Sequence, residues 1–390
     1  MKYNFDATIS RKNNYAAKYD EIKNKFGRDD IIPLWIADMD LPTAQPIIDA
    51  MAKRNAQGMF GYTSRPDSYF EAVQQWQERK NGWTFDKDLA SFCLGVVPAL
   101  ATIIKEFTQE NDKILFFTPV YSEFFDVTKD WNRVPMTIPI LGSGTECMID
   151  FPAFEKALQS KPALFILCNP HNPLGRVWRK EELEKIGNLC LKYHVPIVSD
   201  EIHSDLILWG NKHIPIASIS EEIAANTITC TSATKTFNLA GLQASTIIFP
   251  DKEKQQKFEG FWRKFDVHRN NCFSVVANEV AFREGEEWLE QVLRYIEGNM
   301  EYVKNYLDEK IPEINTYLPE STYLMWLDCR NLNMTGDVLV DFMINEARLG
   351  LGDGRGFGAP EGYMRINVAC PRAILTEALT QLEKAVSARR

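Results

Sequence analysis

The stretch from Ala163 to Ser199 strongly limits the folds open to this chain. Ala163–Cys168 is a short, continuous apolar run, typical of a strand buried on both faces. Val195–Ser199 has the same character, and between the two lies Lys180–Tyr193, which places apolar residues on one helical face: Leu183, Ile186, Leu189, Cys190 and Tyr193. Such a βαβ unit predicts a mostly parallel sheet with right-handed crossovers. Because strands and helices alternate from about residue 90 to 250, we expect a large, doubly wound α/β domain.

The C-terminal part has a different pattern. A long amphipathic helix is predicted over roughly Trp288–Leu307, and a second helix near Val338–Ala347. Strand-like segments lie at Thr322–Leu327 and Tyr363–Val368, and a final helix follows. This grouping predicts a smaller α+β domain. We place the large domain at residues 48–285 and the small domain at residues 1–47 and 286–390.

Composition excludes several classes of partner. The 390 residues carry a formal net charge of −9, which argues against binding to nucleic acid or to an anionic membrane. The longest uncharged apolar run, Phe92–Ile104, is too short to span a bilayer, and the N-terminus lacks the apolar core of a signal peptide. Eight cysteines without a CxxC pair, and histidines without HxxxH or HExxH spacing, predict reduced thiols, a cytoplasmic location and no metal site.

Polar residues follow the predicted strands, where ligands bind in open parallel sheets. Lys235 comes shortly after the β-rich stretch Thr227–Thr231, with Ser232 and Thr234 just before it. A lysine held in an apolar setting loses its proton more easily and can form an imine with a carbonyl, although a lone lysine in a loop is usually a surface charge. Asp200 ends the strand after Ile197, and is either a turn or cap residue or an acid that pairs with a ligand cation.

Three more features belong to the same edge. Gly95 precedes a predicted helix, whose first backbone N–H groups are suited to a phosphate. Tyr121 follows Thr118-Pro119-Val120, and Asn172 follows the Ala163–Cys168 strand. Each of these alone is more typical of an ordinary turn. Together with Asp200 and Lys235 they predict a single site along one doubly wound sheet.

This order of residues resembles the fold-type-I pyridoxal-phosphate enzymes of the aspartate aminotransferase class, and within it the MalY/PatB-type cystathionine β-lyase (C–S lyase) branch. The resemblance runs almost end to end and is carried by seven motifs: Trp35–Asp40, Phe60–Tyr62, Gly95–Ala99, Cys168–Pro173, Ser199–Asp205, Lys235–Gln243 and Tyr363–Asn367. It implies pyridoxal 5'-phosphate as the cofactor and a large domain of the fold-type-I transferases.

The resemblance also implies roles for the residues that surround the cofactor ring. Lys235 would hold the cofactor covalently as an imine and then act as acid and base at the substrate Cα, and with Tyr121 it forms the expected catalytic pair. Asp200 would pair with the pyridinium nitrogen and keep it protonated. Tyr121 would stack on the ring. Asn172 would hydrogen-bond the 3-oxygen of the ring, with His203 beside it.

A second set of implied roles concerns the phosphate and the substrate. The backbone of Val96 and Val97 and the hydroxyls of Ser232 and Thr234 would bind the phosphate. Tyr62 would reach the phosphate of a neighbouring subunit, which implies a homodimer with shared active sites. Arg365 would bind the substrate carboxylate through two parallel hydrogen bonds, assisted by Asn172 and the backbone of Ala37.

One position departs from the aminotransferase pattern. Gln243 stands where many members of the class have a phosphate-binding arginine, and this favours the lyase branch. The expected reaction is α,β-elimination from L-cystathionine, L-cysteine or a related cysteine S-conjugate to a thiol, pyruvate and ammonia. An aminotransferase on the same scaffold is the alternative, and a regulatory protein that acts through a partner is a third reading. The glycine-rich stretch Gly352–Gly358 predicts a mobile loop at the substrate mouth, with Arg355 facing the distal end of the substrate.

Overall fold

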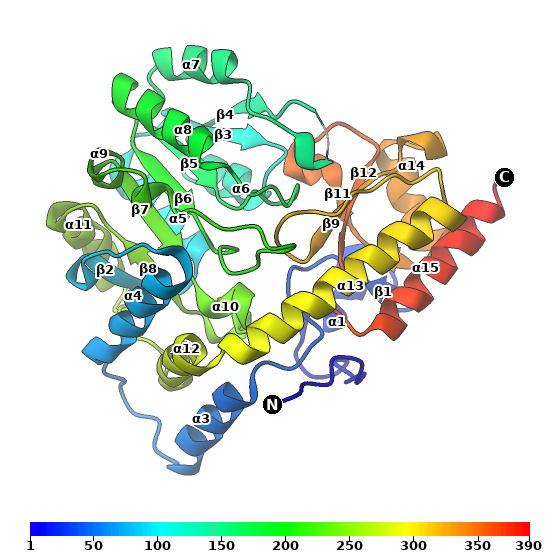
Figure 1. Cartoon of the computed structure of the whole chain (residues 1–390), viewed down its shortest axis with the longest axis horizontal. Helices are drawn as coiled ribbons and strands as arrows, with labels where there is room; N and C mark the ends of the chain where they lie inside the picture. The colour runs from blue at the N-terminus through cyan, green and yellow to red at the C-terminus, as the bar shows by residue number, and fades with distance from the viewer. Residues whose placement is uncertain (143) are drawn as a thin grey trace.

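The computed structural model describes residues 1–142 and 144–390. Its central element is a seven-stranded sheet in which the strands follow the order β2-β8-β7-β6-β5-β3-β4 (Figure 1). Strand β8 is antiparallel to both of its neighbours, and all the other strands share one direction. The strands are β2 Ala90–Cys93, β3 Lys113–Thr118, β4 Val134–Pro139, β5 Leu164–Cys168, β6 Ile197–Asp200, β7 Thr227–Thr231 and β8 Ser245–Ile248. The predicted α/β class and mostly parallel sheet are confirmed.

Helices cover both faces of this sheet, as Figure 1 shows. One layer comprises α5 Val96–Phe107, α6 Glu123–Asp130 and α11 Lys252–Arg263, and the other α7 Phe151–Gln159, α8 Lys180–Tyr193 and α9 Glu221–Ala225. Because successive strand side chains point to opposite faces, β3 divides its apolar residues between two core clusters. Ile114 and Phe116 pack under the first layer, and Leu115 and Phe117 under the second. Burial on both faces explains why these strands are continuous apolar runs.

Helix α8 has the predicted bounds. The backbone N–H of Arg179 donates to Glu182 Oε2 at 2.7 Å, which satisfies one of the donors that a helix start leaves free. Leu183, Ile186 and Cys190 are buried on the inner face. The helix ends at His194, which adopts a left-handed conformation with φ of 56°.

A second unit is built around a three-stranded antiparallel sheet of order β11-β12-β9. The long helix α13, yellow in Figure 1, packs beside α15 along this unit. A short parallel pair, β1 and β10, joins the N-terminal segment to it. The elements are β1 Ile32–Pro33, β9 Leu324–Asp328, β10 Leu349–Gly350, β11 Gly352–Asp353, β12 Tyr363–Asn367, α13 Glu286–Lys310, α14 Gly336–Asp341 and α15 Arg372–Ser387.

The structure bears out one C-terminal prediction and corrects another. The helix predicted near Val338–Ala347 is α14 continued by a π-helical turn at Phe342–Glu346, and the adjacent Phe342 and Met343 are both in the core. The stretch Gly352–Gly358 is not a loop throughout: it forms β11 and a 3₁₀ turn at Gly354–Phe357, and Gly352 pairs with Arg365.

The remaining α-helices are α1 Ala17–Asp20, α2 Ile22–Phe26, α3 Gln45–Ala56, α4 Asp67–Asn81, α10 Ala233–Thr236 and α12 Cys272–Glu284, and α12 contacts α3, α4 and α10. The predicted boundary at residues 47 and 48 falls inside α3, which packs on α12. The other boundary falls at Gly285, between α12 and α13. We propose that the large domain begins at α3 and ends at Gly285, because each limit then leaves a helix whole.

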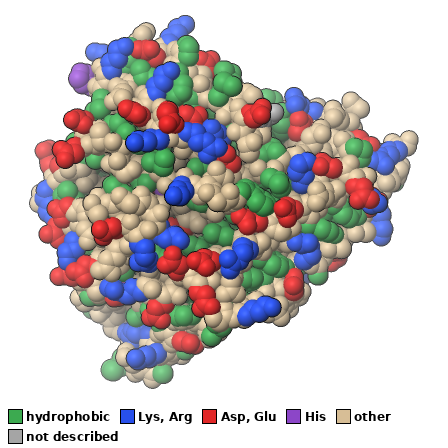
Figure 2. All heavy atoms as spheres, viewed as in Figure 1, with side chains coloured by type: hydrophobic (Ala, Val, Ile, Leu, Met, Phe, Trp, Pro, Cys, Tyr) green, Lys and Arg blue, Asp and Glu red, His purple; other side chains and the backbone are tan. Residues whose placement is uncertain are grey.

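The surface mixes charges of both signs. Figure 2 shows acidic and basic side chains interspersed over the face seen in Figure 1. All eight cysteines are free, and only Cys272 is not fully buried. Within residues 1–142 and 144–390, no helix combines the length and the apolar character needed to cross a membrane.

Candidate active site

The carboxyl edge of the seven-stranded sheet gathers the predicted site residues. Strands β5, β6 and β7 are adjacent, and Cys168, Asp200 and Cys230 are paired in register across them. Asn172 follows β5, and Lys235 lies in the short helix α10 after β7. Tyr121 follows β3, and its ring packs against the core cluster that also contains Cys168, Cys230, Val96 and Val97. The topology therefore brings residues at or just beyond the ends of five strands, β2, β3, β5, β6 and β7, to one place.

Lys235 is held as an amine that can lose its proton. Ser232 caps α10 by accepting from the backbone N–H of Thr234 at 3.1 Å, which orients the helix. The Nζ of Lys235 donates to the backbone oxygen of Ala37 at 2.5 Å. Burial lowers the pKa of Lys235 to about 8, partly offset by the negative charge of Asp38. The lowered pKa makes the neutral amine, the form that acts as a nucleophile, more accessible near neutral pH.

Asp200 is a buried acid that lacks a cation. Its Oδ1 accepts from the backbone N–H of Ile202 at 3.2 Å, and burial raises the pKa of the carboxyl to about 7. None of the ion pairs among the described residues involves Asp200. A cationic group placed beside it would stabilise the carboxylate, so this position suits a protonated ring nitrogen.

The opposite end of the site is suited to an anion. Val96 and Val97 form the first turn of α5, directly after the extended Gly95, and their backbone N–H groups lie at the positive end of the helix dipole. The hydroxyls of Ser232 and Thr234 lie 2.7 Å apart, and Ser232 Oγ also donates to the backbone oxygen of Ala244 at 2.6 Å. Gln243 is exposed and left-handed, with φ of 52°.

Arg365 is a buried cation with no carboxylate among its hydrogen-bond partners. It extends from β12, and its Nη1 donates to Asn172 Oδ1 at 3.3 Å while Nη2 donates to the backbone oxygen of Trp35 at 2.9 Å. Its guanidinium lies 4.5 Å from the centroid of the Phe357 ring. Burial lowers the pKa of Arg365 to about 10, so the group is still charged at pH 7. Its buried Nε has no partner among the described residues, as expected for a group that awaits an anionic ligand.

His203 and Tyr121 stay neutral in this setting. Burial lowers the pKa of His203 to about 3, and the nearby charges of Lys235 and Arg365 act in the same direction. The ring of His203 meets the ring of Tyr323 edge-on, 6.2 Å between centroids. Burial also raises the pKa of the Tyr121 phenol well above its usual value. Both side chains are therefore hydrogen-bonding and packing groups rather than charged ones near pH 7.

Tyr62 is the one predicted site residue that lies apart from the others. Its side chain is 94% exposed, and Arg269 lies over its ring at 5.3 Å. The guanidinium of Arg355 is paired with Asp353 and with the exposed Asp337, each at 2.7 Å, and its contact with the distal end of a substrate stays a prediction.

The structure adds residues that sequence reasoning missed. The Tyr323 hydroxyl donates to the same Ala37 oxygen as Lys235, at 2.9 Å, and Phe357 lies against Arg365. Asn238 and Asn367 hold the backbone around Ala37. Asn238 lies inside the motif Lys235–Gln243, and Asn367 lies inside the motif Tyr363–Asn367. Membership of these motifs was the only sequence signal that pointed to the two asparagines. No group of three or more His, Cys, Asp or Glu side chains suited to a metal ion occurs in the described part of the chain.

This sheet, its helical layers and the lysine, aspartate and arginine around one edge define a fold-type-I transferase of the pyridoxal-phosphate class. The chain belongs to the aminotransferase class I and II family, whose model matches residues 29–382. Cystathionine beta-lyase PatB of Bacillus subtilis is 38% identical over 98% of this chain and 100% of its own length.

Two solved structures are similar along the whole chain. Cystalysin of Treponema denticola, which contains a pyridoxal 5'-phosphate cofactor, has a TM-score of 0.96 and 34% identity, and the match covers 100% of both chains. A pyridoxal-phosphate-bound protein of Clostridium difficile 630, provisionally described as an aminotransferase, has a TM-score of 0.96 and 43% identity over 99% of this chain and 100% of its own. The family expected from the sequence motifs is confirmed.

Proposed function

We propose that this protein is a pyridoxal-phosphate-dependent C–S β-lyase that cleaves L-cystathionine, L-cysteine or related cysteine S-conjugates to a thiol, pyruvate and ammonia. The observation that carries the proposal is the presence of two basic side chains, Lys235 and Arg365, at this site. Lys235 is an amine with a lowered pKa, and Arg365 is a buried guanidinium without a carboxylate. The amine of Lys235 can bind an aldehyde and accept a proton, and the guanidinium of Arg365 can bind an α-carboxylate. The 38% identity to a cystathionine β-lyase supports the lyase over an aminotransferase.

The groups at this edge fit the parts of pyridoxal phosphate one by one. The carboxyl of Asp200 suits the ring nitrogen, the face of Tyr121 suits the ring, and the first turn of α5 suits the phosphate. Asn172 would hydrogen-bond the 3-oxygen of the ring, with His203 beside it. When bound, the cofactor supplies an electron sink for the Cα–H bond electrons of the substrate.

The chain's own residues then perform binding and proton transfer. Arg365, with Asn172 and the backbone at Ala37, binds the substrate carboxylate and orients the Cα–H bond. The neutral amine of Lys235 removes the Cα proton, a contribution of about 10²–10⁴-fold in rate. The β-thiolate then leaves with the electron pair of the C–S bond, and the electrons of the Cα–H bond form the Cα=Cβ bond. Water hydrolyses the released aminoacrylate to pyruvate and ammonia. We place this activity in the cytoplasm, which the eight free thiols support.

A panel of S-substituted cysteines tests the reaction type. The purified enzyme is expected to form pyruvate and one equivalent of thiol from L-cystathionine with no keto acid present, because elimination needs no amino acceptor. Pyruvate and released thiol are measured together, and the same reaction is repeated with added 2-oxoglutarate as the control. Turnover that depends on the keto acid, with the cofactor left as pyridoxamine phosphate, would identify an aminotransferase instead.

We further propose that the enzyme is a homodimer and that Tyr62 reaches the phosphate site of the partner chain. The exposure of Tyr62, together with that of Met59 and Phe60 on the same segment, supports this assignment. An exposed apolar patch usually marks a surface that another protein chain covers.

Mixed dimers test the shared site. Lys235→Ala and Tyr62→Ala chains, each inactive alone, are expected to regain up to about a quarter of wild-type activity when refolded together, because random pairing makes half the dimers hybrids and each has one intact site. Tags on the two chains allow hybrids to be isolated and assayed. Isolated hybrids without activity, or a fully active monomer, would contradict the shared site.

A further inference from the structure

One short segment provides hydrogen-bond partners for both site cations. Arg365 Nη2 donates to the backbone oxygen of Trp35 at 2.9 Å, and Lys235 Nζ donates to that of Ala37 at 2.5 Å. The segment Trp35–Leu41 belongs to no helix or strand. Its carbonyls therefore depend on contacts from outside the segment for their positions.

Asn238 makes three of these contacts. It lies just beyond Lys235 in the chain, and its Nδ2 donates to the backbone oxygens of Met39 and Leu41, each at 2.9 Å. Its Oδ1 accepts from the backbone N–H of Met39 at 3.0 Å. Its backbone is left-handed, with φ of 55°, a conformation that asparagine and glycine tolerate best. Asn238 thereby connects the stretch that follows Lys235 to the segment that contains Ala37, the hydrogen-bond partner of Lys235.

Asn367 makes the corresponding contacts from the other domain. It follows Arg365 on β12, on the same face of the strand, because side chains alternate along a strand. Its Nδ2 donates to the backbone oxygens of Ile36 at 2.7 Å and Asp38 at 2.6 Å. The Lys235 loop and the Arg365 strand therefore each carry an asparagine that binds the same segment.

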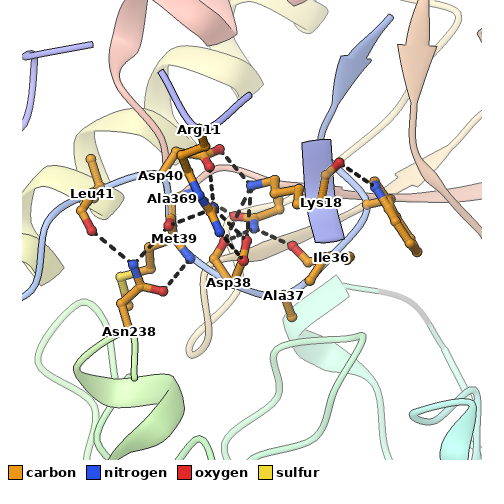
Figure 3. A network of polar contacts seen from close by, with 12 residues as sticks. Arg11, Lys18, Ile36, Ala37, Asp38, Met39, Asp40, Leu41, Asn238 and Ala369 are labelled. Carbon is orange, nitrogen blue, oxygen red and sulfur yellow. Dashed lines mark hydrogen bonds and ion pairs between the residues drawn. The ribbon is translucent and has the colours of Figure 1, made fainter. Parts of the chain in front are cut away.

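An ion cluster of the half-buried Arg11 and Asp38 and the buried Lys18 and Asp40 holds the outer side of the segment. Figure 3 shows Asn238 on one side of the segment, and the two cations of the cluster, Arg11 and Lys18, on another. Arg11 pairs with Asp38 at 2.7 Å and with Asp40 at 2.6 Å, and Lys18 pairs with Asp40 at 2.7 Å. The side chain of Lys18 is 0% exposed and that of Asp40 is 2% exposed. The two positive and two negative charges balance, as buried charges require.

We propose that Asn238 is a positioning residue for proton transfer: by holding Met39 and Leu41 it keeps the Ala37 carbonyl, and with it the amine of Lys235, at a set place relative to Arg365. Asn367 and the ion cluster support the same segment. The inference rests on the roles proposed above for Lys235 and Arg365. A displacement of about 1 Å at a reacting group can cost about 10²-fold in rate, so a small shift of this segment is enough to slow the proton step.

Asn238→Gly tests the proposal, because glycine keeps the left-handed backbone, removes all three contacts and adds no charge. We expect kcat for pyruvate formation to fall at least about tenfold and KM to change by less than kcat, because Arg365 and Asn172 still bind the substrate carboxylate. Bound cofactor is expected to stay at the wild-type level. The kinetic isotope effect with Cα-deuterated substrate should rise, because proton transfer becomes more rate-limiting.

Asn333→Gly is the matched control. Asn333 lies on the exposed surface of the small domain and has the same φ of 55°. Its replacement by glycine should leave kcat and the isotope effect unchanged. Should Asn238→Gly not fold, Asn238→Asp serves under the same criteria, since it keeps the side-chain shape and replaces the donor to Met39 and Leu41 by an acceptor.

The outcomes separate this inference from the proposed function. A kcat and an isotope effect of Asn238→Gly near those of the wild type, while Lys235→Ala is inactive, would overturn the positioning role alone. A lowered kcat with an unchanged isotope effect would also overturn it, because a loss of folded enzyme has that signature. An active Lys235→Ala enzyme would instead overturn the role proposed for the lysine.

Discussion

Lys235→Ala is expected to lose the covalent link to the cofactor and to lower kcat by at least about 10³-fold. The reason is that one amine performs two tasks, as the nucleophile that holds the aldehyde and as the base for the Cα proton, and general base catalysis alone contributes about 10²–10⁴-fold. Burial lowers the pKa of Lys235 to about 8, which favours loss of its proton, and the 2.5 Å contact to the Ala37 oxygen holds the amine in place. The measurements are kcat for pyruvate formation and the absorbance of the resting enzyme.

Borohydride reduction provides an independent readout of the same residue. In the wild type it should fix the chromophore to the peptide that contains Lys235, identified by mass spectrometry, and in Lys235→Ala no peptide should carry it. Lys212→Ala is the control, because Lys212 is an exposed lysine and should be neutral in both assays. A chromophore attached to another lysine, or pyruvate formation at the wild-type rate in Lys235→Ala, would show that the catalytic amine lies elsewhere.

Arg365→Leu is expected to keep its cofactor and its colour and to lose substrate recognition. A charge-assisted hydrogen bond contributes about 1.5–3 kcal/mol, which corresponds to a loss of about ten- to hundredfold in kcat/KM for cystathionine. The loss is larger where orientation of the Cα–H bond also suffers. Arg365→Lys should be impaired as well, because a point charge does not reproduce the planar pair of donors. Both kcat/KM and the absorbance of the resting enzyme are measured.

The neighbouring Arg330 offers a matched control for this prediction. It lies at the end of the same small sheet, is exposed and pairs with Asp328 at 2.6 Å, so Arg330→Leu should leave kcat/KM within about twofold, as exposed ion pairs contribute little. If loss of bound cofactor is the main defect of Arg365→Leu, or kcat/KM does not change, Arg365 has a structural role at Asn172 and Trp35 instead of a role in binding the substrate.

Most regular elements could be read from local pattern. Helix α8 has the predicted bounds, and β7 and the start of β12 are as expected, because apolar runs and helical periodicity depend only on neighbours in the chain. The loop predicted at Gly352–Gly358 was partly wrong because Gly352 and Asp353 pair with β12. This contact with a strand further along the chain leaves no local pattern. The helix predicted near Val338–Ala347 is present, but its local pattern did not show that its second half, Phe342–Glu346, is π-helical.

The sequence by itself determined the sheet, the strand ends and therefore the identity of the polar residues at one edge, since parallel strands deliver their carboxyl ends to the same place. Only the tertiary structure decided what those residues contact. The Ala37 carbonyl lies 198 positions from Lys235, and the Trp35 carbonyl lies 330 positions from Arg365. A backbone carbonyl has no residue type and no period, so its partner cannot be read from a pattern. The same holds for Asn238, whose side chain is typical of a turn until the fold places Met39 and Leu41 against it.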